Sequence, residues 1–298
     1  MSEFMEKVAQ FGDIEENVSF RKLTTLKVGG TARYVIYPNN EFCLESIIDI
    51  CHDEGVDFKM FGNGSNMLCS DDFYDGAIIK LGRYFNKVYY NDYEITAQAG
   101  CSVINLAYEA MKKGMSGLEF ASGIPGTIGG CVFMNAGAYK SSMSDIITEV
   151  QVYRNETTEW ISAEECEFGY RTSVFQKKPW IITAVKMVLK PGKREDIEEL
   201  MKDRQARRFA TQPLEFPSAG SVFRNPENGF SWKYIDMIGY RGMKYGHACV
   251  SQKHSNFIVN EGEATASDIN RLINDIQDKV REAYDVELIL EVEKFNWK

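Results

Sequence analysis

The spacing of hydrophobic residues predicts a strand, a helix and a second strand near the start of the chain. Residues 32–38 (ARYVIYP) are rich in β-branched and aromatic side chains, which favour an extended backbone. Residues 40–55 carry apolar side chains at helical spacing and end at Gly55, which can stop a helix. Residues 57–62 form a second predicted strand that leads into a glycine loop. This pattern predicts a β-α-β unit.

The middle of the chain alternates strand and helix patterns without a strict β-α repeat. The predicted elements are a strand at 76–82, a hairpin turning at Asn91-Asp92, a helix at 102–117, a hairpin at 147–163 turning near Asn155, and a long strand at 179–192. This order favours an α+β fold over a doubly wound α/β sheet.

The pattern changes near residue 192, where we place a domain boundary. A highly charged helix is predicted at 193–213 and ends at Pro213. A second helix is predicted at 267–285, with Ser267 as its N-cap and the apolar face Ile269, Leu272, Ile273, Ile276, Val280 and Ala283. A final strand is predicted at 286–295.

Composition and charge exclude several classes of protein. The 298 residues are 44% hydrophobic and 26% charged, and the net charge of −9 argues against a nucleic-acid or anionic-membrane binder. No secretory signal or apolar run of spanning length is visible, so we expect a cytoplasmic protein. Seven scattered cysteines without a CxxC pair, and only three histidines, argue against a disulfide framework or a zinc site.

Two glycine-rich segments are candidates for cofactor binding. In residues 61–68 (FGNGSNML), glycines can expose successive backbone N–H groups to an anion, although a tight strand-end turn is an equally good interpretation. The segment matches neither the Walker loop nor GxGxxG. Residues 122–139 mix five glycines with apolar side chains, which suits close approach to a flat ligand or simply close packing. Together the two segments suggest a dinucleotide.

The stretch EFPSAGSVFRNP (215–226) raises the question of a nucleophilic serine. No GxSxG elbow and no assignable His-Asp pair accompanies it, so nothing supports a covalent nucleophile. From the residues alone, Ser221 could be a helix cap, and Ser218 better suits a purely structural turn.

Seven motifs in order across residues 24–293 resemble the bacterial UDP-N-acetylenolpyruvoylglucosamine reductase family, also called UDP-N-acetylmuramate dehydrogenases. They are TTLKVGG, FGNGSNML, SGIPGTIGGCVFMNAGAY, YRTSVF, PSAGSVFRNP, VSQKHSNFIVN and LILEVE. The resemblance implies a two-part FAD-binding region of the PCMH/vanillyl-alcohol-oxidase kind and an α+β substrate domain. The implied division is 1–70 with 286–298 returning to it, 71–192, and 193–285 for the substrate. Only 50 positions separate Arg171 from Ser221, which resembles the short second type.

The family's reaction implies three catalytic residues. NADPH reduces FAD, and hydride then passes from flavin N5 to the enolpyruvyl group of UDP-N-acetylglucosamine enolpyruvate, giving UDP-N-acetylmuramic acid for peptidoglycan synthesis. By resemblance, Ser221 donates a proton to carbon, while Arg171 and Glu291 stabilise the enolate. Without the motifs, Arg171 would be a surface arginine and Glu291 a solvated strand residue.

The resemblance also assigns binding residues. Those implied for FAD are Gly62, Asn63, Gly64, Ser65, Asn66, Gly123, Pro125, Gly126, Gly129, Gly130, Asn135 and Gly137, and those for the substrate are Tyr170, Gln212, Arg224 and Asn225. No metal is expected, and no obligate protein partner is implied. Lys140 and His247 depart from the family pattern and put the shape of their loops in doubt.

Two other functions stay open from the sequence. One is a flavin oxidase on the same fold, which often carries covalent flavin. His52 is the only histidine in the FAD region and lies in a predicted helix, so this link is poorly supported. The other is a nucleotide-sugar binder without turnover.

Overall fold

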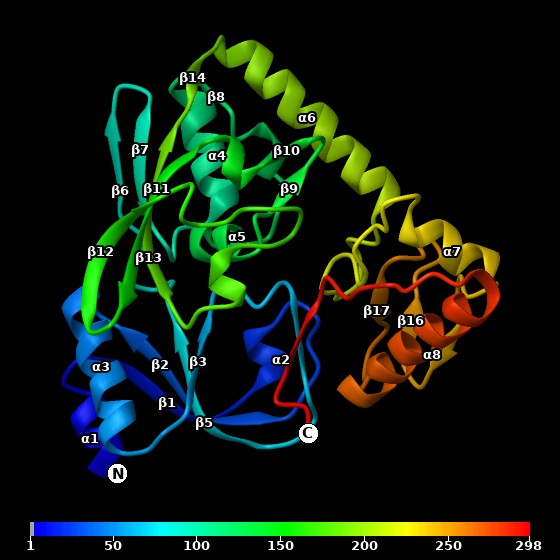
Figure 1. Cartoon of the computed structure of the whole chain (residues 1–298), viewed down its shortest axis with the longest axis horizontal. Helices are drawn as coiled ribbons and strands as arrows, with labels where there is room; N and C mark the ends of the chain where they lie inside the picture. Colours follow the sequence, from blue (N-terminus) through cyan, green and yellow to red (C-terminus); the bar gives the residue numbers. More distant parts are fainter. Residues whose placement is uncertain (1–2) are drawn as a thin grey trace. The chain divides into compact units, whose positions relative to one another are not determined.

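The computed structural model describes residues 3–298, which form two compact units (Figure 1). The first unit contains the described residues up to Glu16, then Tyr34–Asn63 and Asp75–Arg207. The second contains Asn17–Arg33, Gly64–Tyr74 and Arg208–Lys298. Each unit has its own hydrophobic core. The three-part functional division stays a prediction.

One sheet of the first unit has the strand order β1 (Gly12–Ser19), β2 (Thr31–Pro38), β5 (Tyr74–Lys80) and β3 (Phe58–Phe61). The predicted β-α-β elements all form as β2, α3 (Glu41–Asp53) and β3, but β5 lies between the two strands. α3 buries its predicted apolar face, and α1 (Glu3–Val8) packs beside it (Figure 1).

The second sheet of this unit is antiparallel, in the order β12 (Thr157–Ser162), β11 (Ile147–Arg154), β13 (Ile181–Val188), β7 (Glu94–Gln98) and β6 (Val88–Asn91). Both predicted hairpins form and turn through left-handed residues, with φ of 49° at Asp92 and at Asn155. The predicted strand at 179–192 is shorter, because the ladder stops at Val188 and β14 (Lys190–Pro191) pairs separately with β8 (Met115–Ser116).

The remaining elements of the first unit are short, except for one helix. The helices are α4 (Val103–Lys112), α5 (Ile128–Phe133), the one-turn helices Glu119–Ala121, Met143–Asp145 and Val174–Gln176, and α6 (Arg194–Thr211), which runs on into the second unit. β9 (Gly137–Ala138) pairs with β10 (Ser141–Ser142). The charged helix predicted at 193–213 is therefore confirmed as α6. α5 was not predicted, because two of its six residues are glycines.

The second unit is built around α8 (Ala266–Tyr284), which packs on a sheet of β15 (Lys244–Tyr245), β16 (Ala248–Val250) and β17 (Ile258–Asn260). α7 (Ser231–Met237), α2 (Phe20–Leu23) and the parallel pair β4 (Met67–Cys69) and β18 (Glu293–Phe295) complete it.

Three local predictions in this unit are wrong. The N-cap of α8 is Thr265, which exchanges bonds of 3.0 Å with Asp268 in a capping box, whereas the Ser267 hydroxyl donates to Asp71. Ala283 is exposed. The final strand covers only Glu293–Phe295, because the backbone before it bonds to residues around Phe223 instead.

Two structural requirements bear on residues 3–298, those of a membrane-crossing helix and those of a metal-ligand cluster. None of the helices in this range is long and apolar enough to cross a membrane. No three of its His, Cys, Asp and Glu side chains form a group that could hold a metal ion.

We expect the seven cysteines to react slowly with thiol reagents in the folded protein. All seven are buried free thiols, and burial raises the pKa of Cys101 and Cys249 to about 11 and that of Cys131 to about 12. A colorimetric thiol assay at pH 8 should therefore show at least about tenfold slower labelling of native than of urea-unfolded protein. Rapid labelling of any cysteine in the native state would contradict this.

Candidate active site

In the first unit, the two glycine-rich segments lie against each other. The Asn63 side-chain amide donates to the Pro125 carbonyl oxygen at 2.7 Å. Gly62 lies so close to Thr127 that a Cβ atom would overlap the Thr127 hydroxyl oxygen. Thr127 also caps α5, since its hydroxyl accepts from the Gly130 N–H at 3.3 Å. Thr127, which joins the loop to the helix, was not among the residues predicted from the sequence.

The loop continues into the second unit at Gly64, where only glycine fits. Gly64 has φ of +64°, and a Cβ atom there would overlap the Leu23 carbonyl oxygen. The backbone N–H groups of Asn63, Gly64 and Ser65 donate to no acceptor among residues 3–298. Three successive unpaired donors are the arrangement that binds a diphosphate, so these residues fit the phosphates of FAD.

The second glycine-rich segment uses its donors differently. The N–H groups of Ile124, Gly126, Ile128 and Gly129 all donate to backbone oxygens within the unit. Gly129 packs on Ala99, and a Cβ atom added at Gly129 would lie 2.9 Å from the Ala99 Cβ. This segment can therefore offer a ligand a closely packed surface but few backbone donors.

Asn135 and Gly137 in this segment are tied to the loop that carries Arg171. The buried Asn135 amide donates to the Gly169 oxygen at 2.9 Å and accepts from the Ser144 N–H at 3.0 Å. The Arg171 guanidinium donates from Nη2 to the Gly137 oxygen at 2.6 Å. Asn135 is thus a structural support, and Gly137 helps to orient Arg171.

Arg171 itself has a left-handed backbone. Its φ is 56°, within a turn where Gly169 and Thr172 pair, and Gln176 donates to its carbonyl oxygen at 3.1 Å. A left-handed arginine costs free energy, which the surrounding hydrogen bonds offset. Tyr170 is 55% exposed, and its ring centre lies 5.3 Å from the Arg171 guanidinium. An exposed ring beside a fixed cation suits binding of an anionic ligand.

In the second unit, the segment after Ser221 pairs with the segment that carries Glu291. Phe223 and Leu290 form an antiparallel bridge. The Glu291 N–H donates to the Val222 oxygen at 2.8 Å, and the Arg224 N–H donates to the Ile289 oxygen at 2.8 Å. Ser221 and Glu291, separated by 70 positions in sequence, are therefore held in adjacent extended segments.

The structure rules out the helix-cap interpretation of Ser221. The next helix, α7, begins ten residues later at Ser231. The Ser221 hydroxyl forms no hydrogen bond with any residue in 3–298 and is partly exposed. Ser218 lies in the backbone bridge to Val259, and its carbonyl oxygen accepts from the Thr25 hydroxyl at 2.7 Å. Neither serine uses its hydroxyl in a hydrogen bond within residues 3–298, and what sets Ser221 apart is its place next to the segment that pairs with residues 289–291.

Asn66 connects the cofactor loop to Glu291 within the second unit. Its side-chain amide donates to the Glu291 carbonyl oxygen at 2.9 Å, and its backbone oxygen accepts from the Glu293 N–H at 2.8 Å. The side chain and the backbone of Asn66 therefore both fix the backbone that follows the Glu291 side chain.

Two of the predicted substrate residues carry buried polar atoms without a partner. Among residues 3–298, only Gln212 Oε1, Arg224 Nε and Asn270 Oδ1 are side-chain atoms of this kind. Such atoms are costly unless a ligand satisfies them. Asn225 has a structural contact, since its side-chain oxygen accepts from the Ser231 N–H at 3.1 Å.

Two polar residues outside the predicted site, His254 and Lys244, make contacts within the protein. His254 Nδ1 accepts from the Asn256 N–H at 3.3 Å, and burial and the nearby Arg241 lower the pKa of this histidine. Lys244 pairs with Glu261 at 2.5 Å. Of the two departures from the family pattern, Lys140 has φ of 64° and His247 is exposed.

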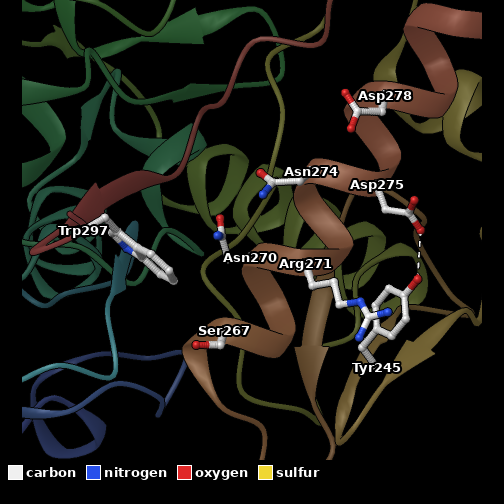
Figure 2. Close-up of a pocket in the computed structure, with 8 residues that line it drawn as sticks. All are labelled: Tyr245, Ser267, Asn270, Arg271, Asn274, Asp275, Asp278 and Trp297. Atoms are coloured by element: carbon white, nitrogen blue, oxygen red, sulfur yellow. Dashed lines mark hydrogen bonds between the residues drawn. The ribbon is translucent and has the colours of Figure 1, made fainter.

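A separate hollow of about 400 Å³ lies on α8 within the second unit (Figure 2). It is lined by Tyr245, Ser267, Asn270, Arg271, Asn274, Asp275, Asp278 and Trp297, none of them a predicted site residue. Most of its polar groups are engaged: Tyr245 donates to Asp275 at 3.0 Å, Arg271 stacks on Tyr245, and Trp297 donates to Leu68. The hollow is open and does not contain the candidate chemistry.

Two family profiles match the chain. Residues 32–162 match the FAD binding domain, and residues 212–295 match the UDP-N-acetylenolpyruvoylglucosamine reductase, C-terminal domain. The first match contains all twelve residues proposed to bind the cofactor, and the second contains Ser221 and Glu291.

Full-length relatives carry the same description. The chain is 41% identical to UDP-N-acetylenolpyruvoylglucosamine reductase of Anoxybacillus flavithermus over 96% of this chain and 95% of that protein. The Bacillus subtilis protein of that name is 38% identical, over 97% and 98%. The crystal structure of the Thermus caldophilus reductase superposes with a TM-score of 0.83 at 33% identity, covering 96% of this chain and 100% of that one.

Replacing Gly64 should weaken cofactor retention in a way that replacing Gly55 does not. Both glycines have nearly the same φ, +64° and +63°, but a Cβ atom at Gly55 has nothing within 4 Å. Gly64→Ala should displace the three unpaired N–H groups, whereas Gly55→Ala should cost only about 1 kcal/mol of backbone strain. The flavin-to-protein absorbance ratio and an FAD titration measure the difference. Equal FAD affinity in two folded variants would show that the loop does not hold the diphosphate.

Proposed function

The chain belongs to the UDP-N-acetylenolpyruvoylglucosamine reductase family, and from this we propose that it reduces UDP-N-acetylglucosamine enolpyruvate to UDP-N-acetylmuramic acid. It is an FAD-dependent oxidoreductase. We assign NADPH as the electron source and place the reaction in cytoplasmic peptidoglycan precursor synthesis, on which cell shape and division depend. The similarity over 96% of this chain and 95% of that relative carries the proposal.

The residues proposed to hold FAD divide into two kinds. Asn63, Gly64 and Ser65 offer unpaired N–H groups for the diphosphate. The segment from Gly123 to Gly137 offers a closely packed surface for the remaining cofactor. When bound, the flavin supplies the hydride that NADPH delivers. We also propose a functional division of the chain. Two parts, residues 1–70 together with 286–298 and residues 71–192, bind the cofactor, and residues 193–285 bind the substrate.

Arg171 is proposed to meet the negative charge that hydride addition creates. Addition of hydride to the terminal enolpyruvyl carbon moves an electron pair toward the carboxylate, and a planar guanidinium can bind both carboxylate oxygens. The turn and the bond to Gly137 hold Arg171 before substrate arrives. Such preorganisation avoids an ordering cost during the reaction.

Ser221 is proposed to protonate the adjacent carbon, with Glu291 stabilising the enolate beside it. A serine hydroxyl is a weak acid, so it can act only on a strongly basic carbon at short range. The hydroxyl has no protein partner in residues 3–298, and its segment is paired with the segment of Glu291. The resulting alkoxide must regain a proton from water before the next turnover.

Four residues are proposed to bind the substrate. The unpaired Oε1 of Gln212 would accept a hydrogen bond from the substrate, and the unpaired Nε of Arg224 would donate one. The exposed ring of Tyr170 and the side-chain amide of Asn225 would add further contacts. A nucleotide sugar has both donors and acceptors to satisfy such a pair.

Two-step anaerobic spectroscopy tests the reaction. The purified protein should be yellow, should bleach on addition of NADPH, and should regain its flavin absorbance when the enolpyruvyl nucleotide is added. Recovery only with oxygen would favour a flavin oxidase instead, and nucleotide binding without any bleaching would favour a binding protein.

Replacing Ser221 should separate the two half-reactions. Ser221→Ala removes the proton donor but not the cofactor site, so NADPH should still bleach the flavin while reoxidation by substrate slows by about 10²-fold or more. Ser218→Ala is the matched control, because the contacts of Ser218 are made by its backbone. Equal slowing of both steps in Ser221→Ala would contradict the assigned role.

A further inference from the structure

The buried side-chain amide of Asn256 makes the two hydrogen bonds to the Phe223 backbone that a neighbouring β-strand would otherwise make. Asn256 is 4% exposed and lies just before β17. Its Oδ1 accepts from the Phe223 N–H at 3.0 Å, and its Nδ2 donates to the Phe223 oxygen at 2.8 Å. Its backbone oxygen also accepts from the Val222 N–H at 2.8 Å. One residue therefore satisfies three backbone groups next to Ser221.

The opposite edge of the same segment carries Glu291. The Val222 oxygen accepts from the Glu291 N–H, and the Arg224 N–H donates to the Ile289 oxygen, both at 2.8 Å. Residues 222–224 thus lie between Asn256 on one edge and residues 289–291 on the other. Movement of this segment along its axis would shift Ser221 relative to Glu291.

We propose that Asn256 is a positioning residue for the protonation step, which it serves by fixing the backbone that carries Ser221. The proposal rests on the proton-donor role proposed for Ser221. A weak acid gains its effectiveness from geometry, and a displacement of about 1 Å can cost about 10²-fold in rate. Asn256 can supply this rigidity because its own N–H is bonded to His254 Nδ1 at 3.3 Å.

Asn260 provides a matched control in the same part of the fold. It is 2% exposed, and its amide donates to the carbonyl oxygens of Leu26 and Lys27, while Oδ1 accepts from the N–H groups of Gly262 and Ala264. None of these side-chain bonds reaches residues 221–224 or 289–291. Substitution there disturbs a buried amide without releasing the Ser221 segment.

The substitution Asn256→Asp tests the proposal with little change in shape. A protonated carboxyl group can donate to the Phe223 oxygen and accept from its N–H, whereas an ionised one sets a negative oxygen against that carbonyl. Burial should raise the pKa of the introduced carboxyl. Above that pKa, substrate-driven flavin reoxidation should be about 10²-fold slower than in the wild type. The difference should shrink as the pH falls.

Each half-reaction rate of a variant is divided by the wild-type rate at the same pH. This division removes any pH dependence that comes from groups common to both proteins near Asn256, which are His254, Arg241 and Asp236. Flavin reduction by NADPH should be unchanged in Asn256→Asp. Asn260→Asp should alter neither rate ratio. Asn256→Ser, which introduces no titratable group, should show the slow reoxidation without recovery at low pH.

Amide hydrogen exchange of Val222 and Phe223 in the holoenzyme gives a second readout, independent of turnover. Both amides should exchange faster in Asn256→Ser and at wild-type rates in Asn260→Asp. Faster exchange with unchanged reoxidation would overturn the positioning role, as would equal slowing of both half-reactions. Full reoxidation in Ser221→Ala would instead refute the role of Ser221, while the exchange data would still report the hydrogen bonds.

Discussion

The chemistry proposed for the second unit depends on one short backbone pairing, between residues 222–224 and 289–291. The two short backbone bonds that join these segments run from Glu291 to Val222 and from Arg224 to Ile289. A slip of one residue would turn Glu291 to the other face, because side chains alternate along extended backbone. The register is held from both sides, by Asn256 bound to Phe223 and by Asn66 bound to Glu291.

In the first unit, the proposed site residues are positioned by close contacts between loops. Asn63 binds Pro125, Gly62 lies against Thr127, and Arg171 binds Gly137. Since loops lack the ladders of a sheet, their shape depends on these few bonds and on glycines that permit close approach. Arg171, which is proposed to stabilise the enolate, shows that such a frame can impose an unfavourable left-handed backbone on a residue.

The elements predicted correctly from the sequence have local signals, and those that were missed depend on distant partners. α3, α8 and both hairpins follow from side-chain spacing and turn residues within one segment. The insertion of β5 between β2 and β3, and the loss of the predicted strand before Glu293, depend on pairing across the chain. The order of the motifs in the sequence predicts the proposed site residues. The bond between Asn256 and Phe223, 33 positions apart, has no local sequence pattern that would predict it.

The buried polar atoms without a partner in the second unit bear on the proposal that Ser221, a weak acid, donates the proton. A buried polar atom without a partner costs about 1–3 kcal/mol, and both Gln212 and Arg224 carry one. Such a cost persists in a fold only if something else offsets it, and binding of a polar substrate would do so. Binding free energy gained at these residues can then hold the reacting carbon against the Ser221 hydroxyl, whose acidity alone would not suffice. In the proposed reaction, the segment that carries Ser221 and the unsatisfied atoms of Gln212 and Arg224 would therefore serve the same step.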